Sequence, residues 1–282
     1  MTRSIAILRS GVLAQAFCRN TARATVEAVF DRSFYLRSGD DFICVGEPEI
    51  GNGPLTLIGR LGALPDMRPR QPAEVSERRI LIDGRIRLSL DGSETWRAPR
   101  WLAGPSPDRL IETCATLAQR AAIDAPEAGF ARLPQIARAR IARFERWLSD
   151  VLAGHAGSAS DAVGLLGLGP GLTPSGDDVL AGALAALDAI GERAAHAALA
   201  RAIVDTLPGA TSPLSACLLR AAAARHIGES LHRAVSSALA GDVDAAIATV
   251  ETVGHSSGWD MLAGVTTALR VAARRPHAVA LS

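Results

Sequence analysis

The amino-acid sequence predicts an α+β protein in which an N-terminal antiparallel β barrel or sandwich is followed by an alanine-rich helical domain. Short β-rich runs separated by turn residues occupy the first part of the chain, and segments with helical spacing of apolar residues occupy the rest. At 282 residues, the chain is long enough to bury two cores. Because the composition changes near residue 105, we expect a β-rich domain over residues 1–104 and a helical domain over residues 105–282.

The β-rich half contains runs of β-branched and aromatic residues bounded by turn signals. These runs lie at residues 25–35, 42–45, 55–58, 80–82 and 86–90. Asp83-Gly84 separates the last two runs and is a strong signal for a tight β-hairpin. Short strands in succession are typical of a small antiparallel barrel or sandwich.

The second half is helical. Ser106 and Pro107 have the character of an N-cap and a first helical residue, and this helix is expected to end near residue 122. Further helices are predicted at about 129–153, 176–191, 193–206, 213–226, 229–240, 242–252 and 257–274. Alanine, the strongest helix former, dominates them and indicates a bundle with close helix contacts.

A repeated octapeptide, S-G-x-D-x-L-A-G, is the most informative feature of the helical half. It occurs at residues 175–182 and again at residues 257–264, with six of eight positions identical. Each copy follows a loop of small and polar residues and leads into an apolar segment. We therefore expect two helix N-termini that are related by approximate internal symmetry and face one shared cleft.

The spacing within each copy suggests an anion site. Ser175 with Asp178, and Ser257 with Asp260, have the spacing of a capping box. The glycine after each serine would leave backbone N–H groups open to a ligand, and a helix N-terminus carries partial positive charge. The alternative is two ordinary capped helices whose final motif glycines, Gly182 and Gly264, merely allow close packing.

Candidate functional residues follow from convergence of the two copies. The candidate catalytic residues are His255, Asp178 and Asp260; His255 is the imidazole beside a motif and would act as general acid. The candidate substrate-binding residues are Gly169, Gly171, Thr173, Ser175, Gly176, Asp177, Ser256, Ser257 and Gly258. The alternative assigns the acids to capping or to dipole compensation, and leaves His255 as a loop residue.

Composition excludes several classes of function. The net charge of +1 and the absence of a basic patch argue against nucleic acid as a partner. The four cysteines are far apart and are read as buried free thiols in a reducing cytoplasm. We expect no membrane span, no metal site and no cofactor. The glycine-rich run at residues 164–171 lacks a P-loop ending and a dinucleotide fingerprint, and no G-x-S-x-G elbow is present.

The glycine-rich run at residues 167–178, together with residues 254–260, resembles the DUF2877 family, which includes the AllH-type subunit of bacterial oxamate carbamoyltransferase. The resemblance extends over most of the chain and includes the Gly-Asn-Gly-Pro loop at residues 51–54. It implies a role in purine and allantoin catabolism, in which an assembly of different subunits splits oxalurate with phosphate into oxamate and carbamoyl phosphate. It also implies phosphate or a carbamoylated small acid as ligand.

Three hypotheses remain open at this stage. The chain is a subunit of a carbamoyl-transferring enzyme that binds a small anionic substrate, with other subunits as partners and a homo-oligomer as a further option. Alternatively, it is a Mg²⁺-dependent, kinase-like nucleotide-binding enzyme that uses the adjacent Asp177 and Asp178. The third hypothesis is a non-catalytic scaffold subunit whose motifs lock two helices together.

Overall fold

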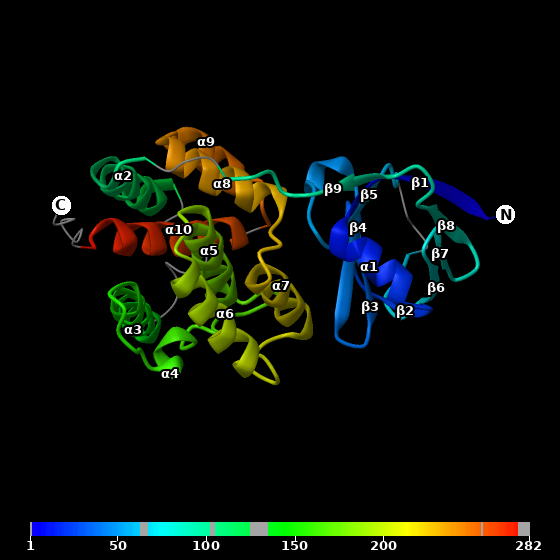
Figure 1. The fold of residues 1–282 in the computed structure, drawn as a ribbon. Helices are drawn as coiled ribbons and strands as arrows, with labels where there is room; N and C mark the ends of the chain where they lie inside the picture. The colour runs from blue at the N-terminus through cyan, green and yellow to red at the C-terminus, as the bar shows by residue number, and fades with distance from the viewer. Residues whose placement is uncertain (1, 63–66, 102–104, 125–134, 255, 276–282) are drawn as a thin grey trace. The chain divides into compact units, whose positions relative to one another are not determined.

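The computed structural model describes residues 2–62, 67–101, 105–124, 135–254 and 256–275. It divides into two compact units (Figure 1). The first unit comprises Met1–Pro99 together with the short segment His226–Glu229, and the second comprises Arg100–Arg225 and Ser230–Ser282.

The first unit is an eight-stranded β barrel with one additional strand. Its strands are β1 (Arg3–Gly11), β2 (Arg23–Val29), β3 (Ser33–Ser38), β4 (Asp41–Gly46), β5 (Thr56–Gly59), β6 (Pro72–Ser76), β7 (Arg79–Ile82), β8 (Ile86–Ser89) and β9 (Glu94–Trp96). Their order is β5-β4-β3-β2-β6-β7-β8-β1-β9, and a second pairing of β1 with β5 closes the barrel. The predicted α+β class with an N-terminal β barrel is thereby confirmed.

The barrel is mixed rather than purely antiparallel. Strand β1 runs parallel to β8 and β9, and β4 runs parallel to β5. The hairpins supply the antiparallel pairs, whereas the parallel pairs arise mainly because β1 is inserted between strands that come much later in the chain. The first half of β1 pairs with β8 and the second half pairs with β5, so one strand closes the barrel and leaves few free edges.

Apolar side chains fill the barrel interior, and turn residues determine where its strands reverse direction. Phe34, Leu36 and Leu57 are fully buried there. Asp83 and Gly84 have φ angles of 49° and 65°, as a tight hairpin turn between β7 and β8 requires, so the predicted turn is confirmed.

A short helix and a 3₁₀ turn complete the first unit: α1 (Val12–Asn20) and η1 (Pro48–Ile50). Neither was predicted. The amides of Leu13 and Ala14 at the start of α1 both donate to the Pro54 carbonyl at 2.9 Å, which fixes the 51–54 loop on this helix. Gly11 must lack a side chain here, because a Cβ would lie 2.1 Å from the Gly53 carbonyl oxygen.

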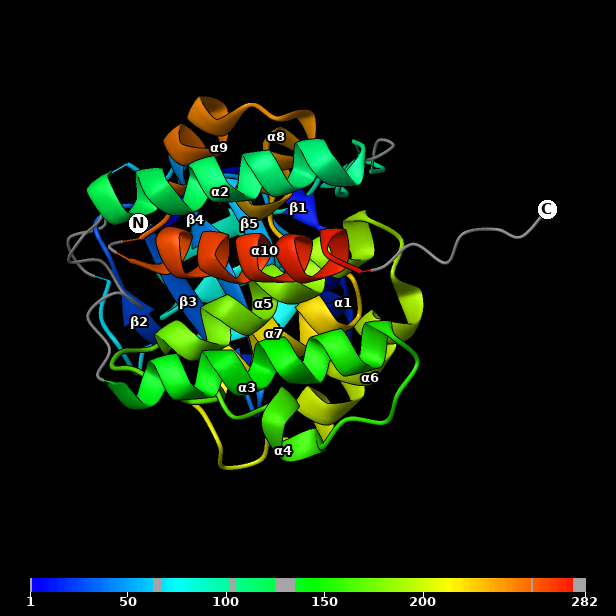
Figure 2. The same ribbon diagram turned by 90° about the vertical axis from the view of Figure 1, so that its left-hand side faces the viewer.

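The second unit is built of helices. They are α2 (Pro107–Asp124), α3 (Gln135–Leu152), α4 (Ala159–Ala162), α5 (Ser175–Ala189), α6 (Arg193–Thr206), α7 (Pro213–Ala223), α8 (Glu229–Ala240), α9 (Val243–Val250) and α10 (Ser257–Ala273). Helix α10 is central to this unit and contacts α2, α3, α5 and α9 (Figure 2). The predicted helical region is confirmed, and α2 begins at Pro107 as expected.

Helices α5 and α10 pack closely through reciprocal glycines. A Cβ on Gly182 would lie 2.0 Å from the Met261 carbonyl oxygen, and a Cβ on Gly264 would lie 1.9 Å from the Val179 carbonyl oxygen. In each case the eighth motif residue faces the fifth motif residue of the other copy. The two copies therefore pack with approximate two-fold symmetry, and the packing interpretation of these two glycines is confirmed.

The four cysteines Cys18, Cys44, Cys114 and Cys217 are buried free thiols. Among the helices of the described chain, none combines the length and apolar character needed to cross a bilayer.

Candidate functional site

The two motif copies meet where α5 and α10 begin. The hydroxyl oxygens of Thr173 and Ser257 lie 3.1 Å apart and share a hydrogen bond. Ser257 also hydrogen-bonds the carboxyl group of Asp178, near the start of α5. The predicted convergence of the two helix N-termini is therefore confirmed by contacts between side chains 84 positions apart in the chain.

Ser175 and Ser257, the predicted N-cap residues, are not the N-caps of these helices. The helices begin at Ser175 and Ser257 themselves, and the preceding residues Pro174 and Ser256 make no side-chain cap bond. In the first copy, Asp178 instead hydrogen-bonds Ser257 of the other copy. A Ser-x-x-Asp spacing is compatible with either arrangement, so the local sequence does not distinguish them.

The glycines that follow these serines do not present open amides. The Gly176 amide donates to the Leu168 carbonyl at 2.8 Å, and the Gly258 amide donates to the Val253 carbonyl at 3.1 Å. Each glycine also lies against the carbonyl of an earlier residue, which leaves no room for a Cβ. The amides of these two glycines are therefore not available to a ligand, and the glycines fold each lead-in loop onto its helix.

Asp177 anchors the glycine-rich loop. It is 1% exposed, and its Oδ1 accepts a hydrogen bond of 2.7 Å from the Gly167 amide. Its Oδ2 accepts from the hydroxyls of Thr211 and Ser215, the latter at 2.6 Å. Buried carboxylates are stable where several donors satisfy them. Asp177 is thus committed to protein contacts rather than directed to a ligand.

Asp178 lies in a different environment. Burial raises the pKa of Asp178 to about 8; the Ser257 hydrogen bond opposes this effect, whereas the charges of Asp260 and Asp177 add to it. Its Oδ2 is buried and has no hydrogen-bond partner among the described residues. Asp260, the equivalent acid of the second copy, is 1% exposed. At neutral pH Asp178 therefore carries a proton and can act as a hydrogen-bond donor.

The loop before α5 depends on glycines with left-handed backbone angles. Gly167, Gly169 and Gly171 have φ angles of 70°, 121° and 95°. A Cβ at Gly169 would lie 2.8 Å from the Ser175 amide nitrogen. These positions require glycine for conformation and close approach, and they bring Thr173 to the start of α10.

The other predicted site residues differ in their exposure to solvent. Ser175 is buried, Ser256 is half-buried, and Gly171 is exposed. His255 lies outside the described residues, so its role as a general acid stays a prediction. In the described part of the chain, no group of three or more His, Cys, Asp or Glu residues could hold a metal ion.

Sequence reasoning missed the residues that support the loop. Thr211 and Ser215 bind Asp177, and the Ser212 hydroxyl donates to the Leu172 carbonyl. Ser212 also caps α7, accepting from the Ser215 amide at 3.0 Å. A Ser-Pro pair at a helix start was a usable signal for this cap. Nothing local to Thr211 or Ser215 indicated their partner.

Residues 165–269 match the family model described as oxamate carbamoyltransferase subunit AllH. The matched segment spans both motif copies, the residues around Asp177, and the contact between Thr173 and Ser257. The resemblance to the AllH-type subunit is confirmed by this match. No curated protein and no solved structure matches the chain.

Proposed function

We propose that this chain is a subunit of a multi-protein carbamoyl-transferring enzyme of the oxamate carbamoyltransferase type. We further propose that it binds a small anion, such as phosphate or carbamoyl phosphate, where α5 and α10 begin. The family match over residues 165–269 carries the proposal, because it covers both helix starts that meet there. The family is described as a subunit of this enzyme, which supports other protein chains as partners.

The chemistry of the junction supports an anionic ligand. Thr173 and Ser257 are half-buried hydroxyls that can donate to an oxyanion. Asp178 is protonated at neutral pH and adds a donor instead of a repelling charge. The N-termini of both helices contribute partial positive charge. Gly169, Gly171 and Ser256 border these groups in sequence and belong to the proposed binding loops.

In the reaction implied by the family, a phosphate oxygen forms a bond to the carbamoyl carbon of oxalurate. The bond from that carbon to the oxamate nitrogen breaks, the phosphate gives up a proton, and the nitrogen gains one. Asp178, with Asp260 beside it, is suited to hold such a proton because its pKa lies near neutrality. His255 is our second candidate for this transfer.

The Mg²⁺-dependent alternative is less well supported, since it requires both Asp177 and Asp178 as ligands. Both Asp177 oxygens are occupied by protein donors. The scaffold alternative is favoured by one observation, namely the reciprocal packing of Gly182 and Gly264, which joins the two helices independently of any ligand.

A thermal-shift screen with phosphate, carbamoyl phosphate, oxamate and MgATP tests the proposal. We expect phosphate or carbamoyl phosphate to raise the melting temperature of the wild-type protein, and the effect to weaken in a Thr173→Val, Ser257→Ala double variant. Thr116→Val is a matched control, because its hydroxyl bonds only within α2. Stabilisation by MgATP alone would contradict the proposal, as would complex formation with another chain without any anion binding.

A further inference from the structure

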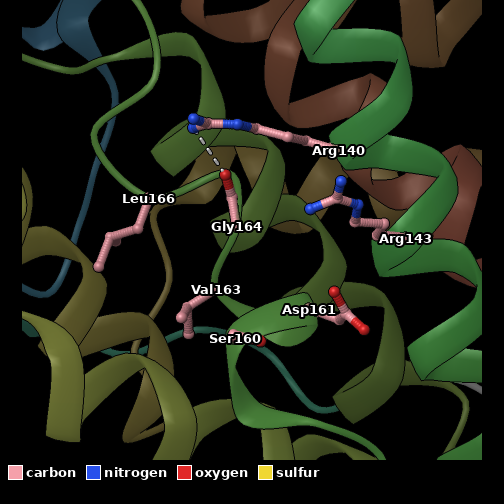
Figure 3. A pocket seen from close by; sticks show the side chains of 7 residues that line it. All are labelled: Arg140, Arg143, Ser160, Asp161, Val163, Gly164 and Leu166. Atoms are coloured by element: carbon pink, nitrogen blue, oxygen red, sulfur yellow. Dashed lines mark hydrogen bonds between the residues drawn. The ribbon is translucent and has the colours of Figure 1, made fainter.

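A cavity with two arginines in its wall lies beside helix α3 of the second unit. This cavity has a volume of about 290 Å³ and opens between α3 and the segment that contains α4 and the turn after it (Figure 3). Its walls are Arg140, Arg143, Ser160, Asp161, Val163, Gly164 and Leu166. Asp178, Thr173 and Ser257 are not among them, so this cavity is separate from the proposed site where α5 and α10 begin.

Two guanidinium groups face this cavity from neighbouring turns of α3 (Figure 3). Arg140 is half-buried, and its Nη1 donates to the Gly164 carbonyl at 2.9 Å, which leaves most of its five donors unused by that bond. Arg143 makes no ion pair or hydrogen bond with any residue that the structure describes. Glu145, an acid on the same helix, is paired with Arg270 instead.

The charge of the cavity walls is positive. Asp161 is the acid among the lining residues, and it faces two guanidinium groups. Guanidinium groups present a planar fork that matches the two oxygens of a carboxylate or a phosphate. We propose that this cavity binds a small oxyanion, a carboxylate or phosphate group, with Arg143 as its main ligand and Arg140 as a second donor.

A ligand in this cavity would lie beside the segment that leads into the glycine-rich loop. Gly164 and Leu166 form part of the cavity wall, and the Leu165 carbonyl between them lies against Gly176 of α5. The Leu168 amide also donates to the Leu165 carbonyl at 3.0 Å. An anion held by Arg143 is thereby connected through packed backbone to the start of α5. The inference concerns a site beyond that of the proposed function and does not rest on it.

Calorimetric titration of the full chain with inorganic phosphate, and separately with oxamate, tests this site at low ionic strength. Arg143→Gln should weaken binding of the preferred anion by about tenfold or more, because it removes a charge-assisted hydrogen bond. Arg146→Gln, an exposed arginine on the same helix outside the cavity, is the matched control and should bind as the wild-type protein does. Asp161→Asn should tighten binding severalfold, because it removes the opposing charge, an effect that a merely structural role for the arginines would not produce.

The titration distinguishes the cavity from the proposed site where α5 and α10 begin. Loss of one binding event in Arg143→Gln, with that event retained in the Thr173→Val, Ser257→Ala double variant, supports the cavity. The anion showing the stronger effect identifies phosphate or carboxylate as its ligand. Equal affinities in Arg143→Gln and Arg146→Gln would overturn the inference, and so would unchanged affinity in Asp161→Asn. If the Thr173→Val, Ser257→Ala double variant alone abolishes binding, the cavity inference is wrong and the proposed function stands.

Discussion

The two copies of the motif share their packing and differ in how their lead-in loops are held. In both, the glycine at position two lies against an earlier carbonyl, the acid at position four is buried, and the glycine at position eight meets the other helix. At position three, the first copy has Asp177 and the second has Trp259. The shared residues therefore build the interface, whereas the difference at position three gives the loop before α5 a buried polar anchor.

The neighbouring acids of the first copy show the same division of roles. Asp177 is surrounded by donors and serves the loop, whereas Asp178 has an oxygen without a described partner and a pKa raised to about 8 by burial. Environment, rather than residue type, separates a carboxylate that several donors hold ionised from one whose pKa burial raises.

The largest expected effect concerns the shared glycines. Gly182→Ala and Gly264→Ala should each destabilise the protein by about 3 kcal/mol or more, because the added methyl group meets a backbone carbonyl that cannot rotate away. Urea unfolding measures both. Gly228→Ala is the control, since its Cβ would find no atom closer than 3.7 Å. Near-normal stability of both motif variants would contradict the reciprocal packing.

Removing the charge of Asp177 should have the next largest effect. Asp177→Asn keeps the shape but loses acceptor capacity for Gly167, Thr211 and Ser215, and we expect a loss of about 2 kcal/mol. Asp178→Asn should instead leave the protein as stable as the wild type or more stable at neutral pH, because folding of the wild-type chain protonates a carboxyl that the unfolded chain has ionised. Urea unfolding at pH 7 compares them, and equal losses would show that the two acids have the same role.

The pH dependence of stability sharpens this contrast. Because the pKa of Asp178 is raised from 3.8 to about 8, the folded state holds a proton that the unfolded state has lost between these values. The contribution of Asp178 to stability is therefore fully present below about pH 4 and is lost as the pH rises toward about 8. Urea unfolding from about pH 5 to about pH 9 should show this decline relative to Asp178→Asn. Parallel curves for the two proteins would contradict the assignment.

The smallest effect is expected at the hydroxyl pair that joins the copies. Thr173→Val and Ser257→Ala should each cost about 1 kcal/mol, with Ser257→Ala the larger because Ser257 also bonds Asp178. A double-mutant cycle should give a coupling free energy of about 0.5 kcal/mol or more. Full additivity would mean that the two hydroxyls do not interact in solution.

Much of the fold could be predicted from local patterns. The ends of α6 and α8 agree with the prediction because turn residues bound their alanine-rich segments. Strand β1 was missed, since its outward positions include the apolar Ala6 and Leu8, which obscure the alternation of its buried Ile5 and Ile7. Its parallel pairing with β8 depends on contacts between distant residues, which no local pattern encodes.

The candidate site shows the same limit. Repetition of the motif was sufficient to predict that the two helix starts converge, and Thr173 and Ser257 confirm it. Thr211 and Ser215, which bind Asp177, come from a distant segment. The sequence therefore predicted that Asp177 binds substrate, whereas the structure shows that it holds the glycine-rich loop. The sequence also did not predict the cavity beside Arg143, because this cavity forms only when α3 packs near the segment around α4.

The most direct test of the central claim is the affinity for carbamoyl phosphate measured by calorimetry from about pH 7 to about pH 9. If protonated Asp178 donates to the bound anion, the affinity of the wild-type protein should fall as the pH rises through about 8. Asp178→Asn, which keeps a donor but cannot ionise, should lose this fall. The same pH profile in both proteins would contradict a role for Asp178 in anion binding where α5 and α10 begin.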